Sequence, residues 1–119
     1  MLDSRSMARL NGVNEDLVRI VLEASKTSPV PFIITEGIRT IQRQAELVSR
    51  GASKTMASKH ITGRAVDVAA IVDGKVSWDW KYYAQIAEVF KSTAANLGIR
   101  IRWGGDWKYF KDGPHFELV

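Results

Sequence analysis

The sequence predicts an α+β fold, in which a mainly antiparallel sheet is packed with about three helices. Segments with apolar residues at helical spacing alternate along the chain with short β-branched runs, which are typical of strands. Asp73-Gly74 is a strong hairpin signal, so the chain after it should return antiparallel to the strand before it. The 119 residues are expected to form one domain with a single core.

Each predicted helix has a start signal. Asn14 is a plausible N-cap for the first helix, which ends before Ser28-Pro29 because a residue that precedes proline resists the α region. Thr40 can cap the second helix and Gly51 can end it, and Asp79 can cap a long third helix. The predicted buried stripes of the three helices are Leu17, Val18, Val21 and Leu22; Ile41, Ala45 and Val48; and Ile86, Val89, Phe90, Ala94 and Leu97.

Five strands are predicted, at 32–35, 64–71, 75–78, 99–103 and 115–119. In the second strand, alternation places Asp67 among small alanines on one face and the valines on the core face. In the last strand, His115 and Glu117 share a face, whereas Phe116 and Leu118 point to the core. The polar, basic segment 52–59 is interpreted as a surface loop and a candidate lid.

Composition narrows the function classes. The chain has no cysteine, which excludes a disulfide framework and a thiol nucleophile. The net charge of +4 favours an anionic partner, although the basic residues are spread along the chain. No apolar run approaches the roughly 20 residues of a membrane span, and the N-terminus has no apolar signal-peptide core. We therefore expect no signal peptide and no stable membrane insertion. We also expect a monomer, although composition does not bear on the oligomeric state.

Two histidines and one aspartate form the main chemical pattern. His60 and Asp67 flank Gly63, and the only other histidine, His115, lies near the C-terminus. Adjacent antiparallel strands would bring the three side chains together. Imidazole nitrogen and carboxylate oxygen suit Zn²⁺, and three protein ligands leave a fourth position open, as in catalytic zinc sites. A half-buried histidine and a turn-capping aspartate are the ordinary alternatives for these residues.

A zinc hydrolase also needs a base for its attacking water. Asp112, three residues before His115, is the first candidate, although Asp112-Gly113-Pro114 is also a good turn sequence. Glu117 is a rival because it shares a strand face with His115. Asp106 is a third option. Spacing alone leaves this choice open.

Four further residues are candidates for substrate contact. Arg39 could clamp a carboxylate or stabilise an oxyanion, and Ser58 could hydrogen-bond the substrate or shape its loop. Trp103 and Trp107 could line a cleft, although aromatic residues in such positions are more often part of the core.

Two motifs carry a family resemblance. Ser58-x-His60-x-x-Gly63-x-Ala65-x-Asp67, followed by Asp112-x-x-His115, resembles the paired signature of the zinc D-Ala-D-Ala peptidase and hedgehog-type family. Glu-Gly-Ile-Arg-Thr at 36–40 and the ending Trp-Gly-Gly-Asp-Trp…His-Phe-Glu are most similar to its L-alanyl-D-glutamate endopeptidase branch, known from phage endolysins and bacterial wall-remodelling enzymes. The similarity runs from about Phe32 to Leu118.

The resemblance implies a fold, a site and an activity. It implies a hedgehog/DD-peptidase-like fold and a single catalytic domain over 1–119, without a separate wall-binding domain. It further implies that Zn²⁺ is held by His60, Asp67 and His115, that Asp112 is the general base, and that Arg39 and Ser58 contact the substrate or transition state. The expected substrate is the stem peptide of peptidoglycan, not nucleic acid. A phage endolysin would wait in the host cytoplasm until it is released to the wall.

Three other functions remain open from the sequence. A D-Ala-D-Ala carboxypeptidase would use the same site and release D-alanine. A non-catalytic wall-binding module would keep the metal but need no base, which Asp112 argues against. A muramidase with two carboxylates would leave both histidines without a role.

Overall fold

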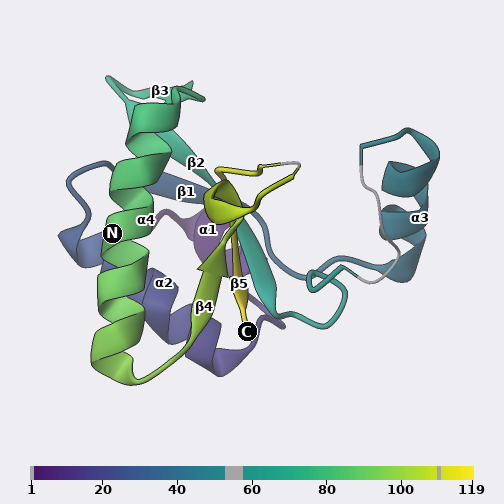
Figure 1. Cartoon of the computed structure of the whole chain (residues 1–119), viewed down its shortest axis with the longest axis horizontal. Helices are drawn as coiled ribbons and strands as arrows, with labels where there is room; N and C mark the ends of the chain where they lie inside the picture. The colour runs from purple at the N-terminus through teal and green to yellow at the C-terminus, as the bar shows by residue number, and fades with distance from the viewer. Residues whose placement is uncertain (1, 53–57, 110) are drawn as a thin grey trace.

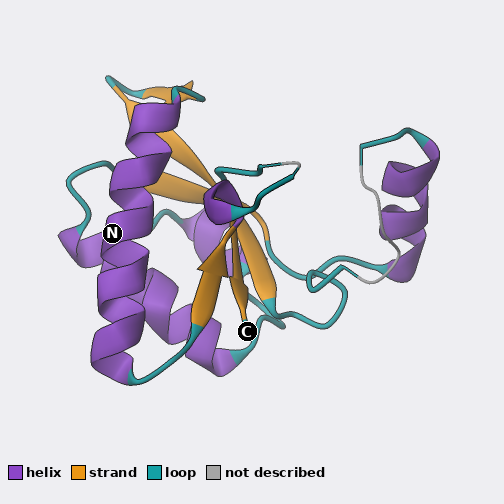
Figure 2. Cartoon of the chain, in the orientation of Figure 1, coloured by secondary structure: helices purple, strands orange, loops and turns teal. Residues whose placement is uncertain are grey.

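The computed structural model describes residues 2–52, 58–109 and 111–119 and confirms the predicted α+β class. Within these residues the chain forms four α-helices and five strands (Figure 1; Figure 2). The helices are α1 (Ser4–Arg9), α2 (Glu15–Thr27), α3 (Ile41–Ser49) and α4 (Trp80–Leu97), with a short 3₁₀ helix η1 (Gly104–Asp106). The strands are β1 (Phe32–Glu36), β2 (Ala65–Val72), β3 (Lys75–Ser77), β4 (Ile101–Trp103) and β5 (His115–Leu118).

The strands form one antiparallel sheet in the order β1-β2-β5-β4, with β3 paired to β2. The hairpin between β2 and β3 turns at Asp73 and Gly74, whose φ angles are 53° and 77°. A two-residue hairpin turn of the I′ type needs positive φ at both positions, which aspartate and glycine tolerate. The hairpin prediction is confirmed.

Three predicted helix caps are also confirmed. Asn14 accepts a hydrogen bond from the backbone N–H of Asp16 at 2.9 Å, and Thr40 accepts one from Arg43 at 3.0 Å. Asp79 accepts one from the N–H of Lys81 at 3.2 Å. These short polar side chains satisfy donors that the first turn of a helix leaves free. Helix α1 was not predicted, because its six residues are too few to show an apolar period.

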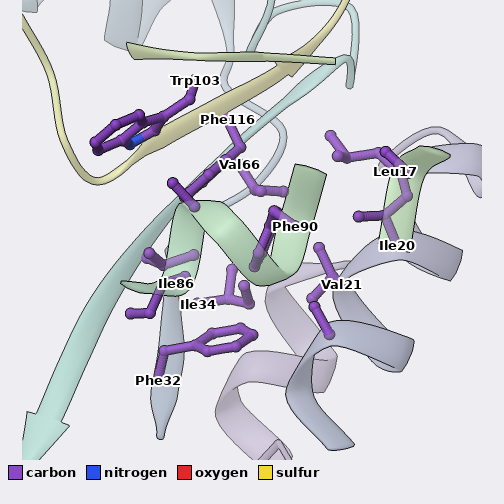
Figure 3. Packing of buried hydrophobic residues seen from close by; sticks show 14 of the residues in the cluster. Leu17, Ile20, Val21, Phe32, Ile34, Val66, Ile86, Phe90, Trp103 and Phe116 are labelled. Atoms are coloured by element: carbon purple, nitrogen blue, oxygen red, sulfur yellow. The ribbon is translucent and has the colours of Figure 1, made fainter. Parts of the chain in front are cut away.

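The core lies between one face of the sheet and helices α2 and α4 (Figure 3). Phe90 of α4 is at its centre, since its ring lies 4.1 Å from that of Phe116 and 5.5 Å from that of Phe32. Val66 and Val68 of β2 enter this core, as the alternation predicted. Asp67 therefore points to the opposite face of the sheet.

Helix α3 departs from the prediction. Ile41 is 66% exposed and Ala45 is exposed, whereas Gln44 is fully buried, so the predicted stripe is wrong. The reason is that α3 stands apart from the sheet and the other helices (Figure 1), and none of its residues belongs to the described core. Most of the predicted loop and lid, residues 53–57, lies outside the described residues. No described helix is long and apolar enough to cross a bilayer.

Candidate active site

His60, Asp67 and His115 converge on the sheet face opposite the core. Asp67 of β2 lies directly across from His115 in the register of β2 and β5, and the loop before β2 brings His60 alongside. Oδ1 of Asp67 is 3.2 Å from Nε2 of His60 and 3.1 Å from Nδ1 of His115. One ligand atom from each residue lies within 4.8 Å of the others. Both histidines are buried, whereas Asp67 is partly exposed.

The outer edge of each imidazole is held by an acceptor. Nδ1 of His60 donates to the carbonyl oxygen of Gly37 at 2.8 Å, and Nε2 of His115 donates to Oε1 of Glu117 at 2.8 Å. Neither acceptor has a proton to give, so in the neutral imidazole the proton sits on the nitrogen that the acceptor contacts. The other ring nitrogen, which faces Asp67, then carries the lone pair.

This arrangement fits a divalent metal ion. Two ligand atoms about 2.0 Å from one tetrahedral ion lie roughly 3.3 Å apart, which is close to both separations from Asp67. Two imidazole nitrogens and a carboxylate oxygen are a donor set that zinc accepts, and second-shell acceptors commonly orient such histidines.

The ionisable side chains of the site shift one another's pKa values. Burial opposes ionisation of Asp67, but its hydrogen bonds to His115 and His60 outweigh that effect and lower the pKa of its carboxyl well below the ordinary range. Burial also disfavours a charged His115, yet hydrogen bonds to Asp67 and Glu117 and the nearby carboxylates raise its pKa to about 9. A proton on His115 and the negative charge of Asp67 therefore stabilise each other.

A cavity of about 560 Å³ opens beside the three side chains. It brings together most of the residues predicted from the sequence to form a site. Its described lining comprises Glu36, Arg39, Leu47, Gly51, Ala52, Ser58, Lys59, His60, Asp67, Trp107, Tyr109, Asp112, His115 and Glu117. The cavity thus has one wall from the end of α3 and another from the loop before β5.

Asp112 is fixed beside this cavity by its backbone. Its N–H donates to the carbonyl of Gly104 at 3.0 Å, and its own carbonyl accepts from the N–H of His115 at 3.2 Å. Burial, followed by the negative charge of Asp67, raises the pKa of the Asp112 carboxyl. A carboxyl with a raised pKa is suited to take up and return a proton.

The two rival bases have other partners. Glu117 lines the cavity but binds Nε2 of His115. Asp106 is exposed and pairs with Nζ of Lys91 at 2.6 Å, and it is not part of the described cavity lining.

Arg39 is held rigidly at the cavity wall. Its Nε and one terminal nitrogen donate to the two carboxylate oxygens of Glu36 at 2.6 and 2.7 Å, and the other terminal nitrogen donates to Oε1 of Gln44 at 2.7 Å. The guanidinium also lies 3.8 Å from Oδ2 of Asp67. A bulge in β1 places Glu36 opposite Asp67, which creates this cluster.

Sequence reasoning missed Glu36 and Gln44 as supports of Arg39. Glu36 lies three residues before Arg39, which is a weak signal for an ion pair. Gln44 gave no signal, because its burial depends on where α3 lies in the tertiary structure.

The two remaining predicted contacts differ in position. Ser58 lines the cavity, and its hydroxyl accepts from the N–H of His60 at 3.2 Å. Trp103 is not part of the described lining: its indole N–H donates to the carbonyl of Gly113 at 2.6 Å, and its ring packs on Trp80. Trp107 lines the cavity instead, with its ring 5.0 Å from that of His115. Substrate contact by Trp103 stays a prediction.

Comparison with solved structures shows other proteins with this fold. The crystal structure of the Serratia marcescens L-Ala D-Glu endopeptidase ChiX has a TM-score of 0.95 and 49% identity, over 100% of this chain and 90% of that one. The vancomycin resistance D,D-pentapeptidase VanY, solved in complex with Zn(II), has a TM-score of 0.60 and 20% identity, over 90% of this chain and 72% of that one. The second likeness shows the fold alone and confirms the predicted DD-peptidase-like architecture.

Sequence comparison extends the relationship to phage proteins. The chain is 33% identical to the L-alanyl-D-glutamate peptidase of Escherichia phage T5, over 96% of this chain and 94% of that protein. The family model for phage L-alanyl-D-glutamate peptidases matches residues 1–119. The chain therefore belongs to the phage L-alanyl-D-glutamate peptidase family.

Proposed function

We propose that this protein is a zinc-dependent endopeptidase that hydrolyses the L-Ala–D-Glu bond in the stem peptides of peptidoglycan. The observation that carries the proposal is the convergence of His60, Asp67 and His115 on one face of a cavity that also holds Asp112. Membership of the phage L-alanyl-D-glutamate peptidase family supports the L-Ala–D-Glu bond as the one that is cleaved. ChiX, whose chain matches nearly throughout, is described as an L-Ala D-Glu endopeptidase.

In the proposed mechanism, His60, Asp67 and His115 would hold the zinc ion. When bound, zinc supplies Lewis-acid chemistry that polarises a carbonyl and acidifies water. Asp112 accepts the proton of the attacking water and returns it to the amine nitrogen of D-Glu as the amide bond breaks. The positive charge of Arg39 stabilises the negative charge that develops on the L-Ala carbonyl oxygen. Because Glu36 and Gln44 fix the guanidinium, little reorganisation is needed during the reaction.

The test is digestion of purified peptidoglycan with and without a chelator, followed by mass spectrometry of the fragments. The expected result is zinc-dependent release of peptides that begin with D-Glu. Free D-alanine would instead identify a D-Ala-D-Ala carboxypeptidase. Zinc binding without any product would identify a wall-binding module.

We also propose that the protein is a phage endolysin, acting as a monomer that stays in the host cytoplasm until it reaches the wall. Family membership supports this setting, and so does the net charge of +4, which suits an anionic wall polymer. Cells that express the protein should lyse when the inner membrane is permeabilised and stay intact before that step.

Zinc binding is expected to release at least one proton at pH 7. Below a pKa of about 9, metal-free His115 is protonated, and a metal ion competes with that proton for Nδ1. The apparent affinity for zinc should therefore rise with pH and level off, for this group, above about 9. Calorimetry in buffers with different ionisation enthalpies measures the released protons. A release of less than half a proton would contradict the charge state assigned to His115.

Gly104→Ala is expected to displace Asp112 and to lower both stability and activity. A Cβ atom at Gly104 would lie 2.2 Å from the backbone oxygen of Asp112, which is a hard overlap with main chain. Overpacking of this kind costs about 1–3 kcal/mol of the free energy of unfolding. Thermal unfolding and peptidase assays measure the two effects.

Gly74→Ala is the matched control for this variant. A Cβ atom at Gly74 meets nothing within 4 Å, although its φ of 77° makes alanine strained there. It should cost about 1 kcal/mol of stability without loss of activity. Equal activity of the Gly104→Ala and wild-type proteins would show that the Gly104 contact does not position Asp112.

A further inference from the structure

The ring nitrogen of His115 that faces away from Asp67 contacts Glu117, and Glu117 in turn pairs with Lys59. Nε2 of His115 donates to Oε1 of Glu117 at 2.8 Å, and Nζ of Lys59 lies 3.2 Å from the second carboxylate oxygen, Oε2. Nζ of Lys59 also donates to the carbonyl of Leu118. Glu117 is only 9% exposed, and it lies in a row at the cavity wall between His115 and Lys59, whose side chain is partly exposed.

The contact with Glu117 determines which nitrogen of His115 is free to bind a metal ion. A neutral imidazole carries its proton on Nδ1 or on Nε2, and only the nitrogen without the proton can bind a metal. A carboxylate can accept but not donate, so Glu117 favours the proton on Nε2 and leaves the lone pair on Nδ1. Nδ1 is the atom that lies 3.1 Å from Asp67.

The two histidines reach this state by different means. His60 is fixed by a backbone carbonyl, that of Gly37, which holds the proton on Nδ1 and turns Nε2 toward Asp67. His115 is fixed by a side chain on its own strand. Substitution can therefore remove the orienting group of His115 without a change in any proposed ligand.

We propose that Glu117 is a positioning residue that holds His115 with its proton on Nε2 and its Nδ1 lone pair toward the metal, and that Lys59 keeps Glu117 in place. This inference rests on the proposed function, because it assumes a metal ion at His60, Asp67 and His115. It gives Glu117, which sequence reasoning considered only as a rival base, a separate role. It also assigns a role to Lys59, for which the sequence offered none.

The test compares zinc affinity, by chelator competition, between the wild type and four variants. Glu117→Ala is expected to weaken zinc binding about 10–100-fold, the usual effect of removing such a partner. Glu117→Gln keeps one acceptor oxygen for Nε2 and is expected to recover most of the affinity. Lys59→Met, in which His115 keeps its acceptor, should lose less than Glu117→Ala. Glu23→Ala removes an exposed glutamate paired with Lys26 and should match the wild type.

A second measurement detects the proton on the imidazole ring of His115. In nitrogen NMR spectra of the zinc-loaded wild type, the Nε2-bound proton of His115 should be visible, because a buried carboxylate shields it from exchange. In Glu117→Ala this proton should exchange rapidly. Thermal unfolding of each metal-free variant shows whether the protein is folded.

The outcomes separate this inference from the proposed function. Wild-type zinc affinity in Glu117→Ala would overturn the inference and leave the proposed function standing. Equal losses in Glu117→Ala and Glu117→Gln would also overturn it, because they would point to the charge and not to the acceptor. A wild-type protein that binds no zinc would overturn both.

Discussion

Asp67→Ala is expected to abolish tight zinc binding and to reduce peptidoglycan cleavage by about 10³-fold or more. Asp67 is the residue that both proposed histidine ligands contact, at 3.2 and 3.1 Å, so its loss removes a ligand and the carboxylate that lies next to both imidazoles. It would also leave the buried guanidinium of Arg39 without one of its two carboxylate neighbours. Lewis-acid stabilisation of the transition state is worth several kcal/mol. A loss of about 4 kcal/mol corresponds to the expected 10³-fold drop in rate.

Zinc content and the rate of product release measure this effect. Asp106→Ala is the matched control, because it removes an aspartate that pairs with Lys91 and is not part of the described cavity lining. It should retain wild-type zinc content and activity. An Asp67→Ala protein that holds one zinc ion with wild-type affinity would contradict the proposed metal centre.

Asp112→Asn is expected to keep zinc and to lower kcat by about 10²–10⁴-fold, the range that general acid–base catalysis contributes. The amide has nearly the shape of the carboxylate but cannot accept the proton of water at neutral pH. Asp112 is not among the residues whose ligand atoms converge on Asp67, so zinc content should not change. Hydrolysis of a synthetic L-Ala–D-Glu peptide, with zinc measured on the same samples, tests both parts.

The pH profile gives a second test of Asp112. Burial and the charge of Asp67 raise its pKa, and a base works only when ionised. In the wild type, activity should therefore fall as the pH drops through a value above the ordinary aspartate pKa of 3.8. Asp112→Asn should lose this acidic limb. If the variant keeps zinc and still cleaves at the wild-type rate, Asp112 is not the base.

Local signals were sufficient for most secondary structure. Asn14, Thr40 and Asp79 cap helices as predicted, because N-capping depends on a side chain and the N–H groups two or three residues later. The Asp73-Gly74 hairpin also depends on adjacent residues. The predicted stripes of α2 and α4 lie in or against the core, whereas the predicted stripe of α3 does not. The spacing of Ile41, Ala45 and Val48 suggested a buried stripe, but α3 stands apart from the core that the described residues form.

The pairing of the strands was predictable only in part. Alternation alone put Asp67 and His115 on faces away from the core. The β2–β5 register then set the two residues directly opposite each other, which allows one carboxylate oxygen to reach both histidines. The sequence predicted the residue types of this site, and the sheet register fixed their distances.

By itself, the sequence determined the class of fold, the caps and hairpin, and the set of side chains able to hold a metal, since these follow from residue type and short-range spacing. Tertiary structure alone decided the partners of those side chains. Lys59 reaches Glu117, and Trp107 rather than Trp103 belongs to the described lining of the cavity. The physical reason is that a side chain's hydrogen-bond partner depends on which distant backbone segment folding brings within about 3 Å, and periodicity carries no such information.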